Sequence, residues 1–256
     1  MFAICNLTLV PVRKESSDRG EMVSQLLFGD AVEILDKYKS WYKIKILADD
    51  YLGWIDQKQV ALINDEEKSN YDSFSNFVSK DLLQIAILNN SEMCTVVMGS
   101  TLPFYSNKKM TFGGNDYSFE GNLVDTLVKQ AEHIPLQAQL YLNSPYLWGG
   151  RSPFGIDCSG LTQIVYKICG YQLKRDANQQ AEQGETISFL EESKPGDLAF
   201  FDNEEGKIIH VGIITHGGHI IHASGKVRVD KLDHQGIFNS DSKKYSHNLR
   251  LIKRFF

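Results

Sequence analysis

A glycine-rich loop, residues 146–157, runs directly into Cys158 and a helical pattern of apolar residues. The pattern has the i, i+3, i+4, i+7 spacing of a helix that buries one face, and its members are Leu161, Ile164, Val165 and Ile168. Gly170 supplies a stop signal, and Asp157 occupies the position of an N-cap. The sequence therefore predicts that Cys158 lies in the first helical turn, where backbone N–H groups lack partners within the helix.

The predicted position of Cys158 suits a nucleophile. A helix N-terminus favours negative charge, so we expect it to favour the thiolate over the thiol. The free N–H groups of the first turn can also stabilise an oxyanion. An unreactive buried cysteine is the alternative, because free cysteines are among the most buried residues. The polar neighbours Asp157 and Ser159 and the glycine-rich approach favour the nucleophile.

Two strand-like runs downstream of the helix flank a turn at residues 216–218 and predict a β-hairpin. A three-residue loop would place Gly212 opposite His222 and bring His210 and His222 onto one face as diagonal neighbours. A two-residue loop would put the two histidines on opposite faces of the hairpin. We predict the three-residue loop.

Cys158, His210 and His222 can together form a catalytic triad. His210 would act as the base, and His222 would accept a hydrogen bond from its far nitrogen and fix its tautomer. The same three side chains could instead ligate zinc, although the sequence lacks the close Cys-x-x-Cys or His-x-x-x-His spacing that zinc sites commonly show. We expect no metal or organic cofactor. The remaining histidines are predicted to be surface or turn residues: His133, His216, His219, His234 and His247.

Five short motifs resemble those of the NlpC-type cell-wall cysteine peptidases in order and spacing. They are Leu-Trp-Gly-Gly at 147–150, Asp-Cys-Ser-Gly-Leu at 157–161, Pro-Gly-Asp-Leu-Ala-Phe-Phe at 195–201, His-Val-Gly-Ile at 210–213 and Ile-His-Ala at 221–223. The resemblance covers about the last half of the chain. It implies an α+β, papain-like fold that hydrolyses peptide bonds in peptidoglycan stems. It also implies that Cys158 is the nucleophile, His210 the base and His222 the orienting residue.

The first half of the chain predicts short strands separated by turns, which is typical of small β-barrels. Residues 1–64 resemble a bacterial SH3-like domain. Residues 65–123 contain further strand-like pieces, including 102–106, and predict a second, more divergent SH3-like barrel. The pattern becomes helical from Leu123, so the papain-like catalytic domain is predicted at 124–256.

The resemblance to relatives with this whole architecture also implies a site for the free α-amine of the substrate. An acidic residue and a tyrosine of the first barrel, and the two residues flanking the nucleophile, would bind it: Glu21, Tyr51, Asp157 and Ser159. An ammonium group that leaves water needs acceptors and a compensating negative charge. Ordinary exposed barrel residues are the alternative for Glu21 and Tyr51. Arg175 and Asp176 resemble an Arg-Asp pair of related enzymes and are assigned to the substrate cleft.

The composition is that of an ordinary globular protein, with 42% hydrophobic and 23% charged residues in a chain of 256. A net charge of −5 argues against nucleic acid and against an anionic membrane surface as partners. The four cysteines are widely spaced and predict no disulfide framework. Three of them are expected in the core: Cys5, Cys94 and Cys169.

The first residues contain no basic region and only a short apolar stretch, which predicts neither a signal peptide nor a membrane span. Taken with the resemblance, which implies a γ-D-glutamyl-L-diamino acid endopeptidase, this leads us to expect a cytoplasmic enzyme that recycles wall peptides of the form L-Ala-γ-D-Glu-diamino acid. A wall-binding module with an inactive peptidase domain, and an amidase or acyltransferase on the same scaffold, stay open. Both meso-diaminopimelate and L-lysine fit the position after γ-D-Glu, and the oligomeric state stays open.

Overall fold

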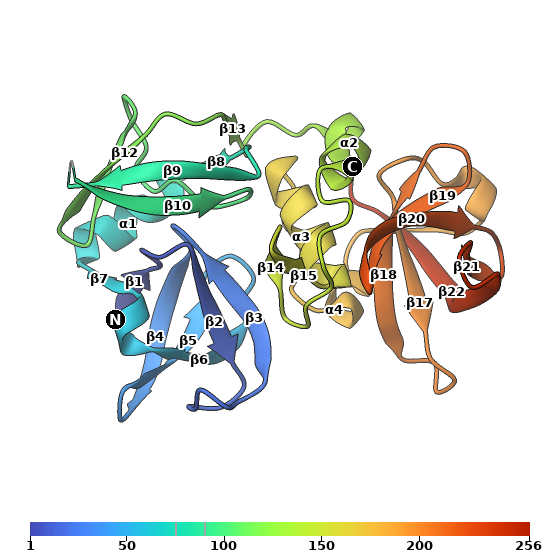
Figure 1. Ribbon diagram of the computed structural model, residues 1–256, viewed down its shortest axis with the longest axis horizontal. Coiled ribbons are helices and arrows are strands. Elements are labelled where there is room, and N and C mark those ends of the chain that lie inside the picture. The colour runs from blue at the N-terminus through green and yellow to red at the C-terminus, as the bar shows by residue number, and fades with distance from the viewer. Residues whose placement is uncertain (75, 90) are drawn as a thin grey trace. The chain divides into compact units, whose positions relative to one another are not determined.

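The computed structural model describes residues 1–74, 76–89 and 91–256. The chain folds as two compact units, each with its own hydrophobic core (Figure 1). Unit 1 consists of Met1–Val128 and Trp148–Ser152, and unit 2 consists of Lys129–Leu147 and Pro153–Phe256. Among the described residues, no helix is long and apolar enough to cross a membrane.

The first seven strands of unit 1 form one antiparallel sheet in the order β3-β2-β6-β5-β4-β1-β7. Their bounds are β1 Phe2–Ile4, β2 Leu9–Arg13, β3 Met22–Leu27, β4 Ala31–Tyr38, β5 Trp41–Ile46, β6 Leu52–Asp56 and β7 Ala61–Ile63. Side chains on one face of these strands, such as Val10, Ile44 and Ile55, are fully buried in a shared core. The sequence prediction of short strands separated by turns is confirmed here.

A helix and a second set of strands complete unit 1. Their bounds are α1 Asp65–Phe74, β8 Phe77–Ser79, β9 Leu83–Leu88, β10 Glu92–Val97, β11 Lys109–Phe112, β12 Asn115–Phe119 and β13 Leu123–Asp125. Four of these strands form a sheet in the order β10-β9-β12-β11, and β13 pairs with β8. The proposed division of the chain at residues 64 and 123 stays a prediction.

Two local expectations in this region are wrong. Leu123 does not begin a helical segment, because residues 123–125 pair with β8, and sheet pairing outweighs a weak helical period. Residues 102–106 form no strand. Pro103 cannot donate to a ladder, and Phe104 has a φ of +55°, which is outside the extended region.

A short segment after residue 147 belongs to unit 1 and is held there by a buried arginine. Arg151 lies in β14 (Arg151–Ser152), and its Nη1 donates to Asp30 Oδ2 at 3.0 Å and to the Gln25 carbonyl at 2.6 Å. The backbone N–H of Arg151 donates to Gln25 Oε1 at 2.8 Å. Arg151 and Asp30 are each about 3% exposed, so the ion pair is shielded from water.

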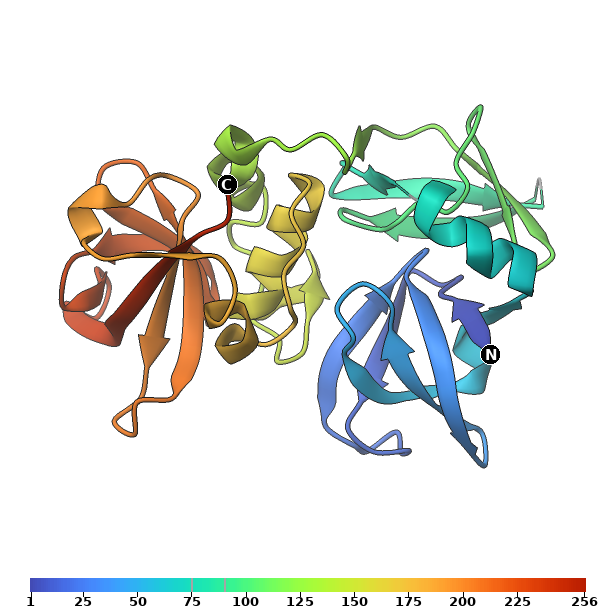
Figure 2. The same cartoon turned by 180° about the vertical axis from the view of Figure 1, so that it is seen from behind.

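Unit 2 contains a closed β-barrel with three helices on one side (Figures 1 and 2). Its sheet has the order β16-β22-β17-β18-β19-β20-β21, and β21 also pairs with β22, so the six strands β17 to β22 close on themselves. The strand bounds are β15 Gly155–Ile156, β16 Glu185–Ile187, β17 Leu198–Asp202, β18 Ile208–Thr215, β19 His219–Ser224, β20 Lys226–Leu232, β21 Gly236–Asn239 and β22 Lys244–Arg254. The helices are α2 Ile134–Gln139, α3 Cys158–Ile168 and α4 Ala177–Ala181, and all three contact β18.

The hairpin between β18 and β19 has the predicted register. Ile213 pairs with Ile221 and Thr215 pairs with His219, which leaves residues 216–218 as the loop. The three-residue loop is therefore confirmed.

We predict that Asp30→Ala destabilises the protein strongly. The substitution leaves the buried guanidinium of Arg151 without its counter-charge, and removal of one partner of a buried ion pair costs about 3–5 kcal/mol. Urea unfolding followed by circular dichroism measures the change in unfolding free energy. The control is Asp36→Ala, because Asp36 is exposed on β4. Equal stability of the two variants would contradict this role for the ion pair.

Candidate active site

Helix α3 begins at Cys158, as the sequence predicts. Asp157 is its N-cap and accepts a hydrogen bond from the Gly160 N–H at 2.6 Å. Gly170, with a φ of +84°, follows the last turn in the left-handed conformation that commonly ends a helix. The buried face of α3 packs on β18 and β19. The helix thus fixes the nucleophile candidate against the two strands that contain His210 and His222.

The Cys158 thiol lies beside the residue that follows His210. Backbone hydrogen bonds from Val211 in β18 and from Ser159 in α3 reach the sulfur. The side chain of Cys158 is only 7% exposed. The fold therefore brings the predicted nucleophile and the predicted base together.

Burial raises the pKa of the Cys158 thiol to about 12, and the negative charge of Asp157 adds to this effect. The backbone hydrogen bonds and Arg175 lower the pKa, but they do not outweigh burial. The expectation that the helix N-terminus makes Cys158 a thiolate is therefore wrong for the free protein. Burial also lowers the pKa of His210 well below its ordinary value, so both groups are neutral near pH 7.

His210 and His222 meet edge to edge. His210 Nε2 and His222 Nδ1 are 2.8 Å apart, and the ring planes are inclined by 86°. Gly212, between them on the same face, makes this contact possible, because a Cβ there would lie 2.9 Å from His222 Cβ. The predicted hydrogen bond within the triad is present.

The carboxylate of Asp230 contacts the far side of the His222 ring, and the sequence analysis did not identify this residue. His222 Nε2 lies 3.1 Å from Asp230 Oδ2, and Arg228 donates to both oxygens of Asp230 at 2.7 and 3.0 Å. Burial alone would raise the pKa of Asp230, but the hydrogen bonds from His222 and Arg228 outweigh it and hold that pKa below its ordinary value. Asp230 is therefore ionised and can only accept hydrogen bonds.

The hydrogen-bond partners determine which ring nitrogens of His222 and His210 carry a proton. Since Asp230 only accepts, the hydrogen of this bond lies on His222 Nε2, and His222 Nδ1 is assigned as the acceptor towards His210. His210 then donates from Nε2, and the lone pair of its Nδ1 is available for the thiol proton. The carboxylate therefore sets the tautomers of both histidines, which is the role of the third member of a catalytic triad.

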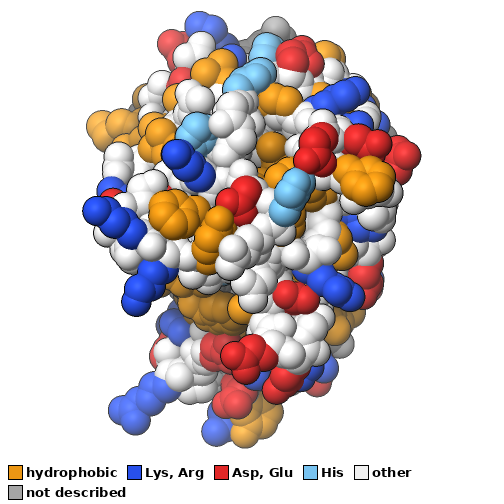
Figure 3. Space-filling model, turned by 90° about the vertical axis from the view of Figure 1, so that its right-hand side faces the viewer, with side chains coloured by type: hydrophobic (Ala, Val, Ile, Leu, Met, Phe, Trp, Pro, Cys, Tyr) orange, Lys and Arg blue, Asp and Glu red, His pale blue; other side chains and the backbone are white. Residues whose placement is uncertain are grey.

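His247 corrects another expectation, because it is a part of this cluster and not a surface residue. Its ring stacks on that of His210, with centroids 4.1 Å apart and planes inclined by 21°. By contrast, His133, His216 and His234 are exposed, as predicted. Figure 3 shows the face on the right of Figure 1, where histidine side chains reach the surface among acidic and basic groups.

The three clustered histidines offer ligand atoms within 4.8 Å of one another, which raises the question of a metal. Metal ligands direct their lone pairs at one point about 2.0–2.1 Å away. The nearly parallel rings of His210 and His247 direct theirs along separate planes, and His210 and His222 already bond to each other. The geometry therefore favours proton transfer over metal binding.

Arg175 ties together the two residues that flank the nucleophile. It is buried, and it donates to both oxygens of Asp157 at 2.6 and 3.1 Å and to Ser159 Oγ at 2.9 Å. Ser159 Oγ also donates to Asp157 Oδ1 at 3.2 Å. The charge of Asp157 is thus already compensated within unit 2.

The other predicted binding residues have local roles. Asp176 is the N-cap of α4, and its backbone N–H donates to Gln179 Oε1 at 3.1 Å. In unit 1, Glu21 Oε1 accepts from Trp148 Nε1 at 2.9 Å, and Tyr51 packs against the core of the first sheet. Their roles in substrate binding stay predictions.

Tyr146 is a further residue near the nucleophile to which the sequence analysis gave no role. Burial raises its pKa to about 12, and the charges of Cys158 and Asp157 add to the shift. Tyr146 is therefore a neutral hydrogen-bond donor near the thiol.

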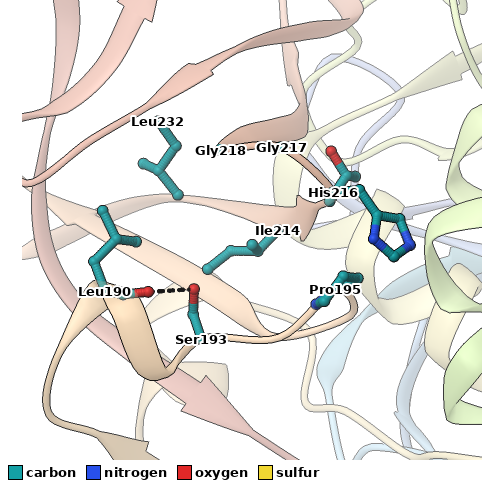
Figure 4. A pocket seen from close by; sticks show the side chains of 9 residues that line it. Leu190, Ser193, Pro195, Ile214, His216, Gly217, Gly218 and Leu232 are labelled. Carbon is teal, nitrogen blue, oxygen red and sulfur yellow. Dashed lines mark hydrogen bonds between the residues drawn. The ribbon is translucent and has the colours of Figure 1, made fainter.

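A separate pocket lies at the hairpin turn of unit 2 (Figure 4). Its volume is about 290 Å³, and its lining includes Leu190, Ile214, His216 and Leu232. The pocket is distinct from the histidine cluster, because the residues that β18 contributes to it, Ile214 and Thr215, lie at the opposite end of the strand from His210.

The comparisons with known proteins agree with this geometry. Residues 143–244 match the NlpC/P60 family. Apart from residues 148–152, this match lies in unit 2. Residues 12–60 match the bacterial dipeptidyl-peptidase SH3 domain. The resemblance inferred from the motifs is thus confirmed, and so is an α+β, papain-like fold with an N-terminal SH3-like domain.

Two curated relatives are gamma-D-glutamyl-L-lysine dipeptidyl-peptidases. The protein of Bacillus subtilis (strain 168) is 29% identical over 223 residues, which cover 78% of this chain and 71% of that protein. The protein of Bacillus cereus (strain ATCC 10987 / NRS 248) is 27% identical over 231 residues, or 81% of this chain and 68% of that protein. This chain is homologous to both, which supports a peptidase whose substrate is a peptide or peptidoglycan.

A solved structure shares the fold over nearly the whole chain. The crystal structure of an NlpC/P60 family protein from Bacillus cereus ATCC 10987 has a TM-score of 0.83, covers 99% of both chains and is 20% identical. At this identity the likeness shows the fold alone.

We predict that alkylation of Cys158 by iodoacetamide accelerates continuously between about pH 6 and pH 10, because the reactive thiolate forms only as pH approaches its raised pKa. Mass spectrometry of the peptide that contains Cys158 measures the rate. A rate that is already maximal below about pH 7 would contradict a neutral thiol and would indicate a thiolate–imidazolium pair.

We also predict that Asp230→Asn lowers kcat by a factor on the order of 10–100, the range for partners that orient a functional ring. The amide keeps the shape but removes the charge that fixes the proton on His222 Nε2. Steady-state kinetics checks this, with Asp233→Asn, an exposed carboxylate after β20, as control. An unchanged kcat in Asp230→Asn would show that the carboxylate does not contribute to the reaction.

Proposed function

We propose that the chain is a cysteine endopeptidase that cleaves the bond between γ-D-glutamate and the diamino acid of peptidoglycan stem peptides with a free N-terminal L-alanine. The observation that carries the proposal is the hydrogen-bonded series His210–His222–Asp230 beside the thiol of Cys158. The choice of bond is supported by the two relatives named gamma-D-glutamyl-L-lysine dipeptidyl-peptidase.

The reaction starts from two neutral groups. Cys158 Sγ attacks the carbonyl carbon of the γ-glutamyl bond while His210 Nδ1 takes the thiol proton. His210 then gives this proton to the nitrogen of the diamino acid, the C–N bond breaks, and a thioester remains on Sγ. Water, deprotonated by the same ring, hydrolyses the thioester and restores the thiol. These steps need no metal or organic cofactor.

Negative charge develops on the carbonyl oxygen in each addition step. The backbone N–H of Cys158 at the start of α3 and the neutral phenol of Tyr146 are donors of the kind that stabilise such an oxyanion. Because the Tyr146 pKa is raised to about 12, the phenol keeps its proton throughout the neutral pH range.

The preference for a free amine needs an anionic partner. Glu21, Tyr51, Asp157 and Ser159 are the predicted residues, but Arg175 already compensates Asp157. Glu21 is exposed and accepts from Trp148, and water screens its ion pair with Lys14, so Lys14 offsets its charge less than the buried Arg175 offsets that of Asp157. The charge argument therefore assigns recognition of the ammonium mainly to Glu21.

Recognition of a free amine also determines where such an enzyme acts. A stem still attached to glycan lacks this amine, so the substrate is a released peptide. We therefore include a cytoplasmic role in the recycling of wall peptides in the proposal. Nucleic acid and membranes are not partners in it.

We predict that the protein hydrolyses L-Ala-γ-D-Glu-diamino acid peptides and leaves their N-acetylated forms intact. Chromatography of the released diamino acid measures both rates, with lysine and diaminopimelate peptides compared. Cys158→Ala supplies the blank, because it removes the nucleophile. Hydrolysis by that variant would refute the cysteine mechanism, and equal rates on free and acetylated peptides would refute recognition of the amine.

The role of Glu21 is tested within the same assay. Glu21→Gln should raise KM for the free peptide by about tenfold or more, since a hydrogen bond to a charged group contributes roughly 1.5–3 kcal/mol. Glu15→Gln, which changes an exposed carboxylate before the same strand, is the matched control. Equal KM values for the two variants would contradict the assignment.

A further inference from the structure

His247 contacts the base of the proposed reaction and has no role in the mechanism described so far. Its ring stacks on His210 with centroids 4.1 Å apart, and it meets the ring of His222 edge to face at 5.8 Å. We propose that His247 is a positioning residue, which holds the imidazole of His210 in its reactive orientation and keeps water away from the His210–His222 hydrogen bond. This inference rests on the proposed function.

The closure of the barrel places His247 in this position. His247 lies on β22, and its partner across the ladder to β21 is Ile237. Ile237 belongs to the core inside the barrel, and directly opposed residues of paired strands point to the same face. His247 therefore points inward, as His210 and His222 do from β18 and β19.

The ring of His210 has an aromatic or imidazole neighbour on several sides. Phe201 lies 5.8 Å from it at an inclination of 47°, and Phe201 also meets His247 edge to face at 5.9 Å. His222 occupies Nε2 of His210. Together with the stacked ring of His247, these contacts leave the Nδ1 edge of His210 for the thiol.

The orientation of the His247 ring is itself defined. Ser246 Oγ lies 2.8 Å from His247 Nδ1, a hydrogen-bond distance. Burial lowers the pKa of His247 to about 4, so the ring is neutral at pH 7. A neutral ring can stack on His210 without repelling the imidazolium that forms when His210 takes the thiol proton.

The stacked ring of His247 also explains part of the lowered pKa of His210. Burial is the main reason that the pKa of His210 lies well below its ordinary value, and His247 and His222 contribute further. The titratable groups in contact with His210 are His222 from β19 and His247 from β22, and the Cys158 thiol of α3 lies against the next residue, Val211. Removal of the His247 ring exposes His210 to water and raises its pKa.

The experiment compares His247→Phe, which keeps a planar ring, with His247→Leu, which fills similar space without one. We expect His247→Phe to retain kcat. His247→Leu should lose about ten- to a hundredfold in kcat, as misplaced catalytic groups do, with KM changed by less than about twofold. Because His210 must be neutral to act as a base, its raised pKa should also move the acidic limb of the kcat profile to higher pH in His247→Leu only. His234→Ala, at an exposed histidine, is the control.

Two results overturn the inference: a kcat in His247→Leu equal to that in His247→Phe, or an acidic limb that does not move. Thermal unfolding of both variants separates these effects from loss of the fold. Alkylation of Cys158 at neutral pH supplies a measure that needs no substrate. If the unaltered protein hydrolyses none of the peptides, the proposed function fails. The positioning role then fails separately if His247→Leu is alkylated at the unaltered rate.

Discussion

The hydrogen bond between His210 and His222 is the contact on which the chemistry of unit 2 depends. It exists in only one register of the hairpin, because a shift by one residue would turn one ring to the opposite face. It also requires a glycine at position 212, where any side chain would occupy the space of His222. Because His222 also bonds to Asp230 on the neighbouring strand, the carboxylate determines which nitrogen of His210 carries the proton. The register of these two strands therefore also determines that the proton of His210 lies on Nε2.

Burial protects this series and determines how it works. A solvent-exposed pair of cysteine and histidine can rest as separated charges, but here both charged forms would lose their hydration. The resting state is a thiol next to an imidazole. In the proposed mechanism, charge therefore develops only when the sulfur attacks the carbonyl group of the substrate. This arrangement also limits side reactions of the sulfur with other electrophiles.

The sequence allowed prediction of the features that are local or periodic. The helix after Asp157 follows from the spacing of its apolar residues. The pairing of the two histidines follows once the three-residue loop is chosen over the two-residue one. Asp230 and His247 could not be found in this way. Asp230 lies on β20, which pairs directly with β19, but no pattern in the sequence marks it as the partner of His222. His247 lies on β22, which approaches His210 only through its pairing with β17 and β21. The raised pKa of Cys158 was likewise missed, because it depends on how completely the folded chain covers the sulfur.

The path of the chain before the nucleophile has a consequence for how such a protein can change during evolution. The polypeptide leaves unit 2 after Leu147, contributes Trp148–Ser152 to unit 1, and returns at Pro153. Within that excursion, Arg151 is paired with Asp30, a residue from the other end of the sequence. Exchange of residues 1–128 alone would therefore leave the guanidinium of Arg151 without its counter-ion, a few residues before helix α3. Residues 1–128 and the segment 148–152 can be replaced only together, although they are separated in the sequence.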